Sequence, residues 1–260
     1  MALIRCDFFS EALEVGTTMT VVLPQPAEGQ IGVEASGAAD APPVLYLLHG
    51  LSDDGSAWLR YSSIERYATA RGLAVVMPAV GRSFYADEAH GHRYWTYLTE
   101  ELPRTVARFF NVSGRREDTF VAGLSMGGYG ALKWALRQPE RFAAAASLSG
   151  ALDLSVLEED ESRHPLLRQV FDGHVGPDDD LFELLAAVDV PTLPALYVGC
   201  GTEDHLLAGN QRFLAALEAA GVPAQVDLRP GEHEWSLWDT VIQDVIDWLP
   251  VGAPAASLGA

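Results

Sequence analysis

The sequence predicts an α/β fold with a mostly parallel central sheet and helices on both of its faces. Short continuous apolar runs recur along the chain, and most are separated by stretches with helical periodicity. Such runs are typical of strands buried on both faces of a sheet. Alternation of strands and helices favours parallel pairing, because each helix returns the chain to the edge where the next strand begins. A chain of 260 residues, 48% of them hydrophobic, is large enough to bury such a sheet.

The first apolar runs lie around 4–9 and 17–23, and we expect them to form an N-terminal β-hairpin. The second run ends at Pro24, which can terminate a strand but cannot continue its hydrogen-bond ladder. Residues 24–43 are rich in Pro, Gly and Ala and show no apolar period. They predict an irregular connection.

The alternating part of the chain follows. Its predicted strands are Val44–Leu48, Leu73–Met77, Thr119–Ala122, Ala143–Leu148, Ala195–Val198 and Ala224–Leu228. Its predicted helices are Ser62–Arg71, Thr99–Phe110, Gly128–Gln138, Asn210–Ala220 and Ser236–Leu249. Three of these helices stop directly before Pro139, Gly221 and Pro250, the residue types that end helices.

The segment 151–190 breaks the alternation with an acidic composition and weak helical signals. It is expected to be an insertion over one end of the sheet. Two interpretations stay open, a solvated surface excursion and a lid that borders the functional site. We expect residues 1–250 to form one domain and 251–260 to be a flexible tail.

The charge balance limits the partners. There are 17 Lys and Arg residues against 36 Asp and Glu residues, which gives a formal net charge of −19. A field of that sign repels the phosphates of nucleic acids and anionic membrane surfaces. We therefore expect no nucleic acid and no membrane as a partner.

Cysteine usage and the absence of targeting signals predict a cytoplasmic location. Cys6 and Cys200 are too few for a disulfide framework, so both are expected to be thiols. No basic segment followed by an apolar stretch opens the chain, and no window holds 18 uninterrupted apolar residues.

The motif G-x-S-x-G occupies 123–127, between a predicted strand and a predicted helix. This is the context of a nucleophile elbow, a tight strand-to-helix turn that exposes a serine hydroxyl in the α/β-hydrolase fold. Glycines two residues on either side of Ser125 remove the side chains that would collide in that turn. Ser125 is the predicted nucleophile.

A serine hydroxyl needs a base, and in this fold an acid and then a histidine follow the serine along the chain. Asp204 lies just past a predicted strand, where α/β sheets gather functional loops, and its neighbour Glu203 is the alternative acid. His233 lies between the last predicted strand and the last predicted helix, the position expected of the base. Asp204 would hold the imidazole in the required tautomer.

Two backbone N–H groups are expected to stabilise the oxyanion of the tetrahedral intermediate. Met126 begins the helix after the serine, where free N–H groups and the helix dipole point toward the site. Leu51 follows His49 and Gly50 in the loop after the first predicted parallel strand. We assign the donors to Met126 and Leu51, with His49 bracing the loop.

These segments resemble the esterase D group of α/β hydrolases, and within it the chain is most similar to the tributyrin esterases. The resemblance rests on His49-Gly50-Leu51, the stretch 123–130, the stretch 200–204 and His233-Glu234-Trp235. It implies a serine carboxylesterase for short acyl chains, with Ser125, Asp204 and His233 as the triad and with no metal or organic cofactor. The lipase-type H-G-G-G is absent, which argues against long-chain substrates.

Alternatives remain open at this point. Related branches hydrolyse S-formylglutathione, remove acetyl or feruloyl groups from carbohydrates, or transfer mycolyl groups. A non-catalytic hydrolase fold used for binding is a further alternative. The expected partner is a small-molecule ester, and homo-oligomer formation stays open.

Aromatic residues near the strand ends are candidates for an apolar acyl pocket. Those selected are Trp58, Tyr85, Trp95 and Trp235, with Phe84 and Tyr94 close by. Trp235, two residues after the proposed base, is the best placed. Since no His, Cys, Asp or Glu cluster shows metal-ligand spacing in the sequence, no metal site is expected.

Overall fold

A computed structural model describes residues 1–25, 31 and 41–252 of the chain. Most of the connection expected at 24–43, and the tail from 253 onward, lie outside the described residues. Within the described part of the chain, no helix combines the length and apolar character needed to cross a bilayer.

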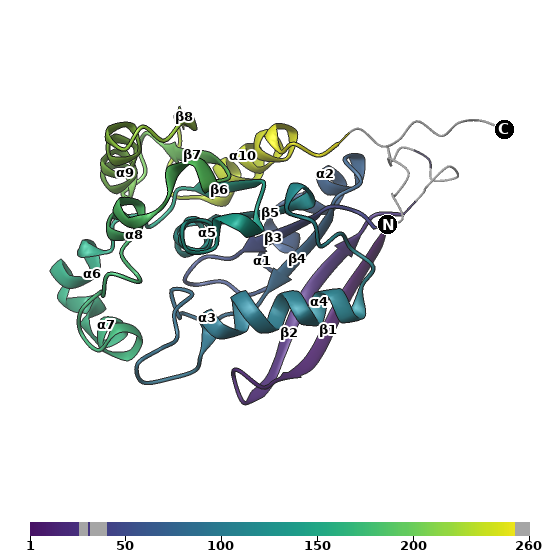
Figure 1. Ribbon diagram of the computed structural model, residues 1–260, viewed down its shortest axis with the longest axis horizontal. Coiled ribbons are helices and arrows are strands. Elements are labelled where there is room, and N and C mark those ends of the chain that lie inside the picture. Colours follow the sequence, from purple (N-terminus) through teal and green to yellow (C-terminus); the bar gives the residue numbers. More distant parts are fainter. Residues whose placement is uncertain (26–30, 32–40, 253–260) are drawn as a thin grey trace.

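Eight strands form one sheet in the order β1-β2-β4-β3-β5-β6-β7-β8 (Figure 1). Their bounds are β1 Ala2–Ser10, β2 Val15–Leu23, β3 Val44–Leu48, β4 Ala74–Pro78, β5 Thr119–Leu124, β6 Ala144–Leu148, β7 Ala195–Gly201 and β8 Ala224–Arg229. Strand β2 pairs antiparallel with β1 and β4, and all neighbours from β4 to β8 pair in parallel. The predicted hairpin and mostly parallel sheet are confirmed.

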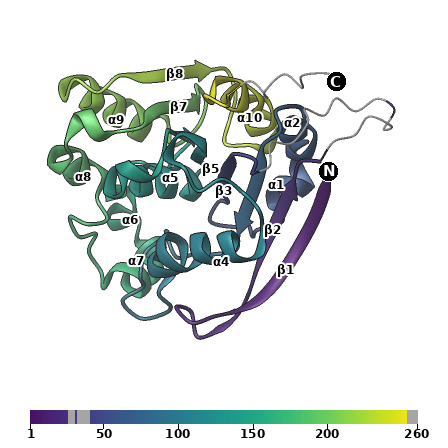
Figure 2. The same ribbon diagram turned by 45° about the vertical axis from the view of Figure 1, so that its right-hand side comes forward.

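Helices cover both faces of this sheet (Figure 2). Their bounds are α1 Ala57–Tyr61, α2 Ile64–Ala70, α3 Tyr94–Thr96, α4 Leu102–Phe109, α5 Met126–Arg137, α6 Ser155–Glu159, α7 His164–Phe171, α8 Leu181–Ala187, α9 Leu207–Ala219 and α10 Trp235–Trp248. One apolar core joins α1, α2 and α10 to the sheet, and the other joins it to α4, α5, α8 and α9.

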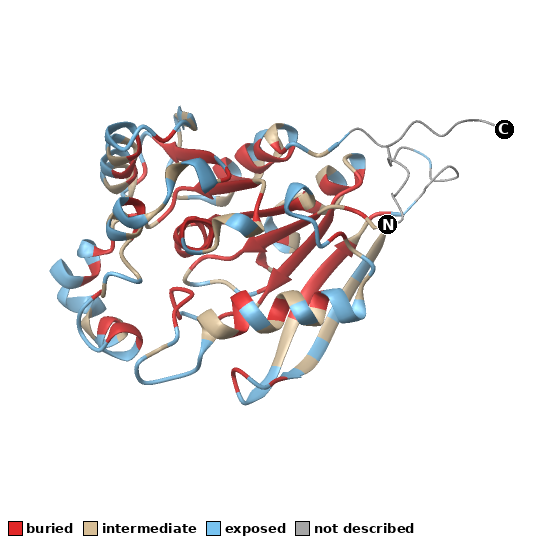
Figure 3. Cartoon of the chain, in the orientation of Figure 1, coloured by how far each residue is buried: buried red, intermediate tan, exposed pale blue. Residues whose placement is uncertain are grey.

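The central strands are buried on both sides, as their continuous apolar sequences predict (Figure 3). In β3, Leu45 and Leu47 enter the core under α1, α2 and α10, whereas Tyr46 and Leu48 enter the opposite core. Successive side chains of a strand point to opposite faces, so an uninterrupted apolar run fills both cores. The carboxyl ends of β3, β5, β6 and β7 therefore lie at the same edge of the sheet, in that order.

The segment 151–190 contains α6, α7 and α8 and packs near α5. Lys133 of α5 is fully buried and forms an ion pair with Asp179 of this segment. The hydroxyl of Tyr129 donates a hydrogen bond of 2.6 Å to the carbonyl oxygen of Asp179. Burial lowers the pKa of Lys133, and the nearby Asp179 carboxylate opposes that change. These contacts fix the segment against the helix that follows Ser125.

Candidate functional site

Ser125 occupies the sharp turn between β5 and α5. Its φ angle is +54°, in the left-handed region that a residue with a side chain rarely adopts. The turn is crowded: a Cβ on Gly123 would lie 2.3 Å from the carbonyl oxygen of Gly127, and one on Gly127 would lie 2.4 Å from that of Leu48. Only glycine fits at both positions. The tight turn that the two glycines permit holds the Ser125 side chain half-exposed at the carboxyl end of the sheet.

We expect Gly127→Ala to destabilise the protein by about 3 kcal/mol or more, because backbone atoms of the β3 end must move to admit the methyl group. Urea unfolding measures this loss. Gly16→Ala is the matched control, since no heavy atom lies within 4 Å of a Cβ placed there. Equal unfolding midpoints for the two variants would contradict the close packing described for the elbow.

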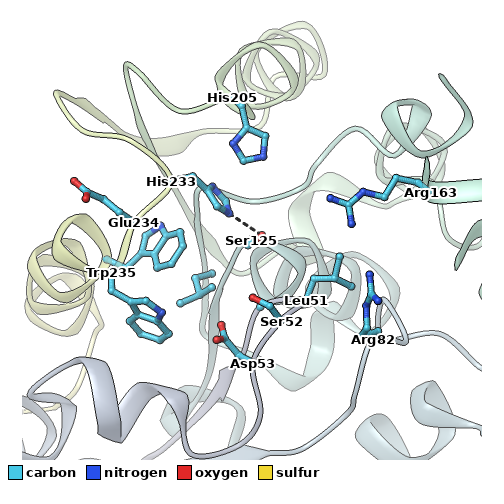
Figure 4. A pocket seen from close by; sticks show the side chains of 13 residues that line it. Leu51, Ser52, Asp53, Arg82, Ser125, Arg163, His205, His233, Glu234 and Trp235 are labelled. Atoms are coloured by element: carbon cyan, nitrogen blue, oxygen red, sulfur yellow. Dashed lines mark hydrogen bonds between the residues drawn. The ribbon is translucent and has the colours of Figure 1, made fainter. Parts of the chain in front are cut away.

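The structure brings Ser125, His233 and Asp204 into one hydrogen-bonded chain. Figure 4 shows the part of it that joins His233 to Ser125. The Nε2 atom of His233 lies 3.0 Å from Ser125 Oγ, and its Nδ1 atom lies 2.8 Å from Asp204 Oδ2. An ionised carboxylate can only accept, so Nδ1 carries the proton and donates to Asp204. The free Nε2 lone pair then accepts the hydroxyl proton of Ser125.

Asp204 lies in a fully buried position beyond the end of β7. Burial alone would raise the pKa of its carboxyl group, but hydrogen bonds from His233 and from the backbone N–H of Leu206 more than offset this, so the pKa lies below its usual range. Asp204 is therefore ionised at neutral pH.

Two further rings contact the His233 imidazole. The His205 ring centroid lies 4.6 Å away and that of Trp238 lies 4.8 Å away, both in edge contacts. These contacts restrict rotation of the imidazole and keep Nε2 directed at Ser125.

Glu203, the alternative acid, has a different environment. Its carboxylate accepts hydrogen bonds from the backbone N–H of Gly231, at 2.5 Å, and from the hydroxyl of Thr202, at 2.8 Å. The first of these is the main cause of its lowered pKa. Glu203 thus braces the loop that carries His233, whereas Asp204 makes the contact with the ring.

The loop after β3 places Leu51 beside Ser125 in the wall of one pocket. Among the described residues, none accepts a hydrogen bond from the backbone N–H of Leu51 or of Met126. Both predicted oxyanion donors are therefore available to a ligand. Free N–H groups are expected at Met126 because it opens α5.

His49 braces this loop from below. Its Nε2 accepts a hydrogen bond of 3.1 Å from the backbone N–H of Val80, and its Nδ1 donates one of 2.8 Å to the carbonyl of Gly50. Burial lowers the pKa of His49, which matches a neutral ring with one donor and one acceptor. The buried Tyr85 hydroxyl donates a third bond, of 2.8 Å, to the carbonyl of His49.

Of the four aromatic residues predicted to line the pocket, the structure places only Trp235 in its wall. Trp58 is buried beneath it, and its indole N–H donates to the carbonyl of Leu48. Tyr85 is buried under the loop after β3, where its hydroxyl donates to the carbonyl of His49. The Trp95 ring lies beneath Lys133 and Arg137, each 4.6 Å from its centroid. Three of the four residues selected from the sequence thus lie outside the wall of this pocket.

The pocket around Ser125 has a volume of about 770 Å³, and much of its wall is polar. Residues of this wall that were not predicted from the sequence include Ser52, Asp53, Arg82, Arg163, His205, Glu234 and Trp238. Ser52, Asp53 and Arg82 could have been predicted to line the site, because they occupy loops just after β3 and β4, where α/β sheets collect binding groups. The position of Arg163 could not be predicted, since Arg163 belongs to the aperiodic segment 151–190. That segment therefore borders the pocket.

The described residues contain one group that offers ligand atoms to a metal ion. Asp204, His205 and His233 each place a nitrogen or oxygen atom within 4.8 Å of the others. This group could not be predicted from the sequence, because only the fold brings His233 close to Asp204 and His205. Asp204 and His233 are hydrogen-bonded to each other, so a metal ion there would compete with that bond.

Comparisons with known proteins agree on one family. The Esterase family model, described as "Putative esterase", matches residues 10–248. An acetyl esterase from Caldicellulosiruptor saccharolyticus is 27% identical over 96% of this chain and 98% of its own.

Two solved structures from Staphylococcus aureus cover 96% of this chain and 98% of their own, each at 34% identity. One is the fluorophosphonate-binding serine hydrolase F, with a TM-score of 0.85. The other is an S-formylglutathione hydrolase, with a TM-score of 0.81.

Proposed function

Since the chain belongs to the esterase family and is a carboxylic ester hydrolase, we propose that it hydrolyses short-chain acyl esters through an acyl-enzyme on Ser125. The observation that carries this proposal is the hydrogen-bonded chain from Ser125 through His233 to Asp204 at the wall of the pocket. This arrangement supplies a nucleophile, a base and an acid that orients the base.

In the first half of the reaction, Ser125 Oγ attacks the ester carbonyl carbon while His233 Nε2 takes the hydroxyl proton. The carbonyl oxygen becomes an oxyanion, which the N–H groups of Leu51 and Met126 would stabilise. The protonated His233 then gives its proton to the departing alkoxide, and the alcohol leaves. Asp204 remains ionised throughout and stabilises the imidazolium.

In the second half, a water molecule replaces the alcohol. His233 takes a proton from this water as it attacks the acyl carbonyl carbon. Collapse of the second tetrahedral intermediate breaks the bond to Ser125 Oγ, which regains its proton from His233. The carboxylic acid leaves, and the free enzyme is restored.

A thioester substrate is the second candidate, supported by the 34% identity to the S-formylglutathione hydrolase of Staphylococcus aureus. The same three residues would act, with a thiolate as the leaving group. Measuring kcat/KM for 4-nitrophenyl acetate and for S-formylglutathione separates the two. We expect the oxygen ester to be turned over efficiently. If kcat/KM is low for the oxygen ester and high for the thioester, thioester hydrolysis becomes the proposed function.

We expect kcat/KM to be highest from acetyl to butyryl esters and to fall by octanoyl. A methylene group gains about 0.8 kcal/mol only where it is buried against apolar surface. In the pocket wall that surface comes from Leu51, Leu124, Trp235 and Trp238, and much of the rest is polar or charged. A series of 4-nitrophenyl esters measures this, and a steady rise to dodecanoyl would contradict the proposed preference.

A further inference from the structure

Two arginine side chains enter the pocket on the same side. Arg82 comes from the loop after β4, and Arg163 comes from the turn directly before α7. Figure 4 shows both guanidinium groups near Leu51, facing the open space beside Ser125. The acidic residues of the wall, Asp53 and Glu234, lie toward Trp235 instead. One side of the pocket is therefore cationic.

The two segments that carry these arginines are fastened to each other. The backbone N–H of Ala89 donates to the carbonyl of Val170 at 3.0 Å, and that of His90 donates to the carbonyl of Gln169 at 2.9 Å. A side-chain hydrogen bond of 3.0 Å joins His90 Nε2 to Asp172 Oδ1. These bonds hold the loop after β4, which carries Arg82, against α7, which directly follows Arg163.

The charges of the two arginines are largely unused within the protein. Considering the described residues, Arg82 makes no ion pair, and Arg163 has one long contact of 3.7 Å with Asp160. The chain as a whole holds 36 acidic residues against 17 Lys and Arg. A cationic pocket wall in so acidic a protein points to a ligand of negative charge.

We propose that Arg82 and Arg163 form a subsite for a carboxylate group carried by the ester substrate. A guanidinium group presents N–H donors in a planar fork that matches the two oxygens of a carboxylate. The inference rests on the proposed ester hydrolysis and narrows its substrates to acidic esters. The carboxylate belongs either to the acyl part or to the alcohol part of the ester, and the subsite recognises the same group in both.

The test compares matched pairs of esters. For the acyl part, 4-nitrophenyl hemisuccinate is compared with neutral 4-nitrophenyl butyrate. For the alcohol part, 4-acetoxybenzoate is compared with its methyl ester. The quantity measured is the ratio of kcat/KM for the acidic ester to that for the neutral ester. Differences in intrinsic reactivity cancel when this ratio is compared between variants.

We expect Arg82→Gln and Arg163→Gln each to lower the ratio about tenfold in at least one pair, because each removes a charge-assisted hydrogen bond. Arg108→Gln is the matched control, an exposed arginine of α4 outside this pocket, and it should leave the ratio unchanged. In the unmodified protein the ratio should also fall as salt increases, since exposed charges are screened.

The outcomes separate this inference from the proposed function. A drop in either pair supports the subsite and identifies the part of the ester that carries the acid. If both variants keep the unmodified protein's ratios while the neutral esters are still hydrolysed, the subsite is wrong and ester hydrolysis stands. If the unmodified protein turns over none of the four esters, the proposed function itself fails.

Discussion

Replacing Ser125 by alanine is expected to lower kcat for 4-nitrophenyl acetate by about 10⁶, the scale of loss seen when a serine nucleophile is removed. The variant keeps the pocket and the backbone N–H groups of Leu51 and Met126, but it lacks the Ser125 Oγ that lies 3.0 Å from His233 Nε2. Steady-state kinetics with the purified variant measures the loss.

Ser236→Ala serves as the control for this substitution. Ser236 is exposed at the start of α10, two residues beyond Glu234 in sequence and outside the pocket wall. We expect its activity to match that of the unmodified protein. Substantial hydrolysis by Ser125→Ala, above the level that the remaining N–H groups explain, would show that another residue is the nucleophile.

Asp204→Asn is expected to lower kcat by about 10⁴, the size of loss reported for removal of the acid's charge in serine triads. An amide nitrogen at this position favours the His233 tautomer that carries its proton on Nε2. That tautomer cannot accept the hydroxyl proton of Ser125. Stability against urea should be followed alongside, because Asp204 is buried and also accepts a hydrogen bond from Leu206.

Glu203→Gln is the matched comparison on the neighbouring residue. Its carboxylate contacts the Gly231 backbone and Thr202, not the His233 ring, so we expect a loss of less than about tenfold. A large loss at Glu203 with little change at Asp204 would reverse the assignment of the acid.

The sheet and the elbow were predictable because local sequence determines them. Continuous apolar runs such as Val44–Leu48 are typical of strands that face two cores, and the observed β3 has these bounds. The elbow was recognisable because close backbone approach at Gly123 and Gly127 excludes every larger residue. The order of serine, acid and histidine along the chain then limited the partners of Ser125 to the loops after β7 and β8.

The pocket wall was less predictable, because it depends on the directions of side chains rather than on their positions in sequence. Trp58 and Tyr85 lie close to the site, but their polar atoms turn inward to the carbonyls of Leu48 and His49. A buried indole or phenol needs such a partner, and these carbonyls become available only in the folded chain. Arg163 reaches the pocket through the tertiary contacts of the segment 151–190. Such contacts produce no periodic pattern in the sequence, so the position of Arg163 could not be predicted.

Covalent labelling tests most directly whether Ser125 is the nucleophile of this site. The purified protein is treated with a fluorophosphonate, digested, and the modified peptide is sequenced by mass spectrometry. We expect one adduct per chain, on Ser125 Oγ, with ester hydrolysis lost at the rate at which the adduct forms. An adduct on any other residue that accompanies the loss of activity would contradict the assignment of Ser125 as the nucleophile.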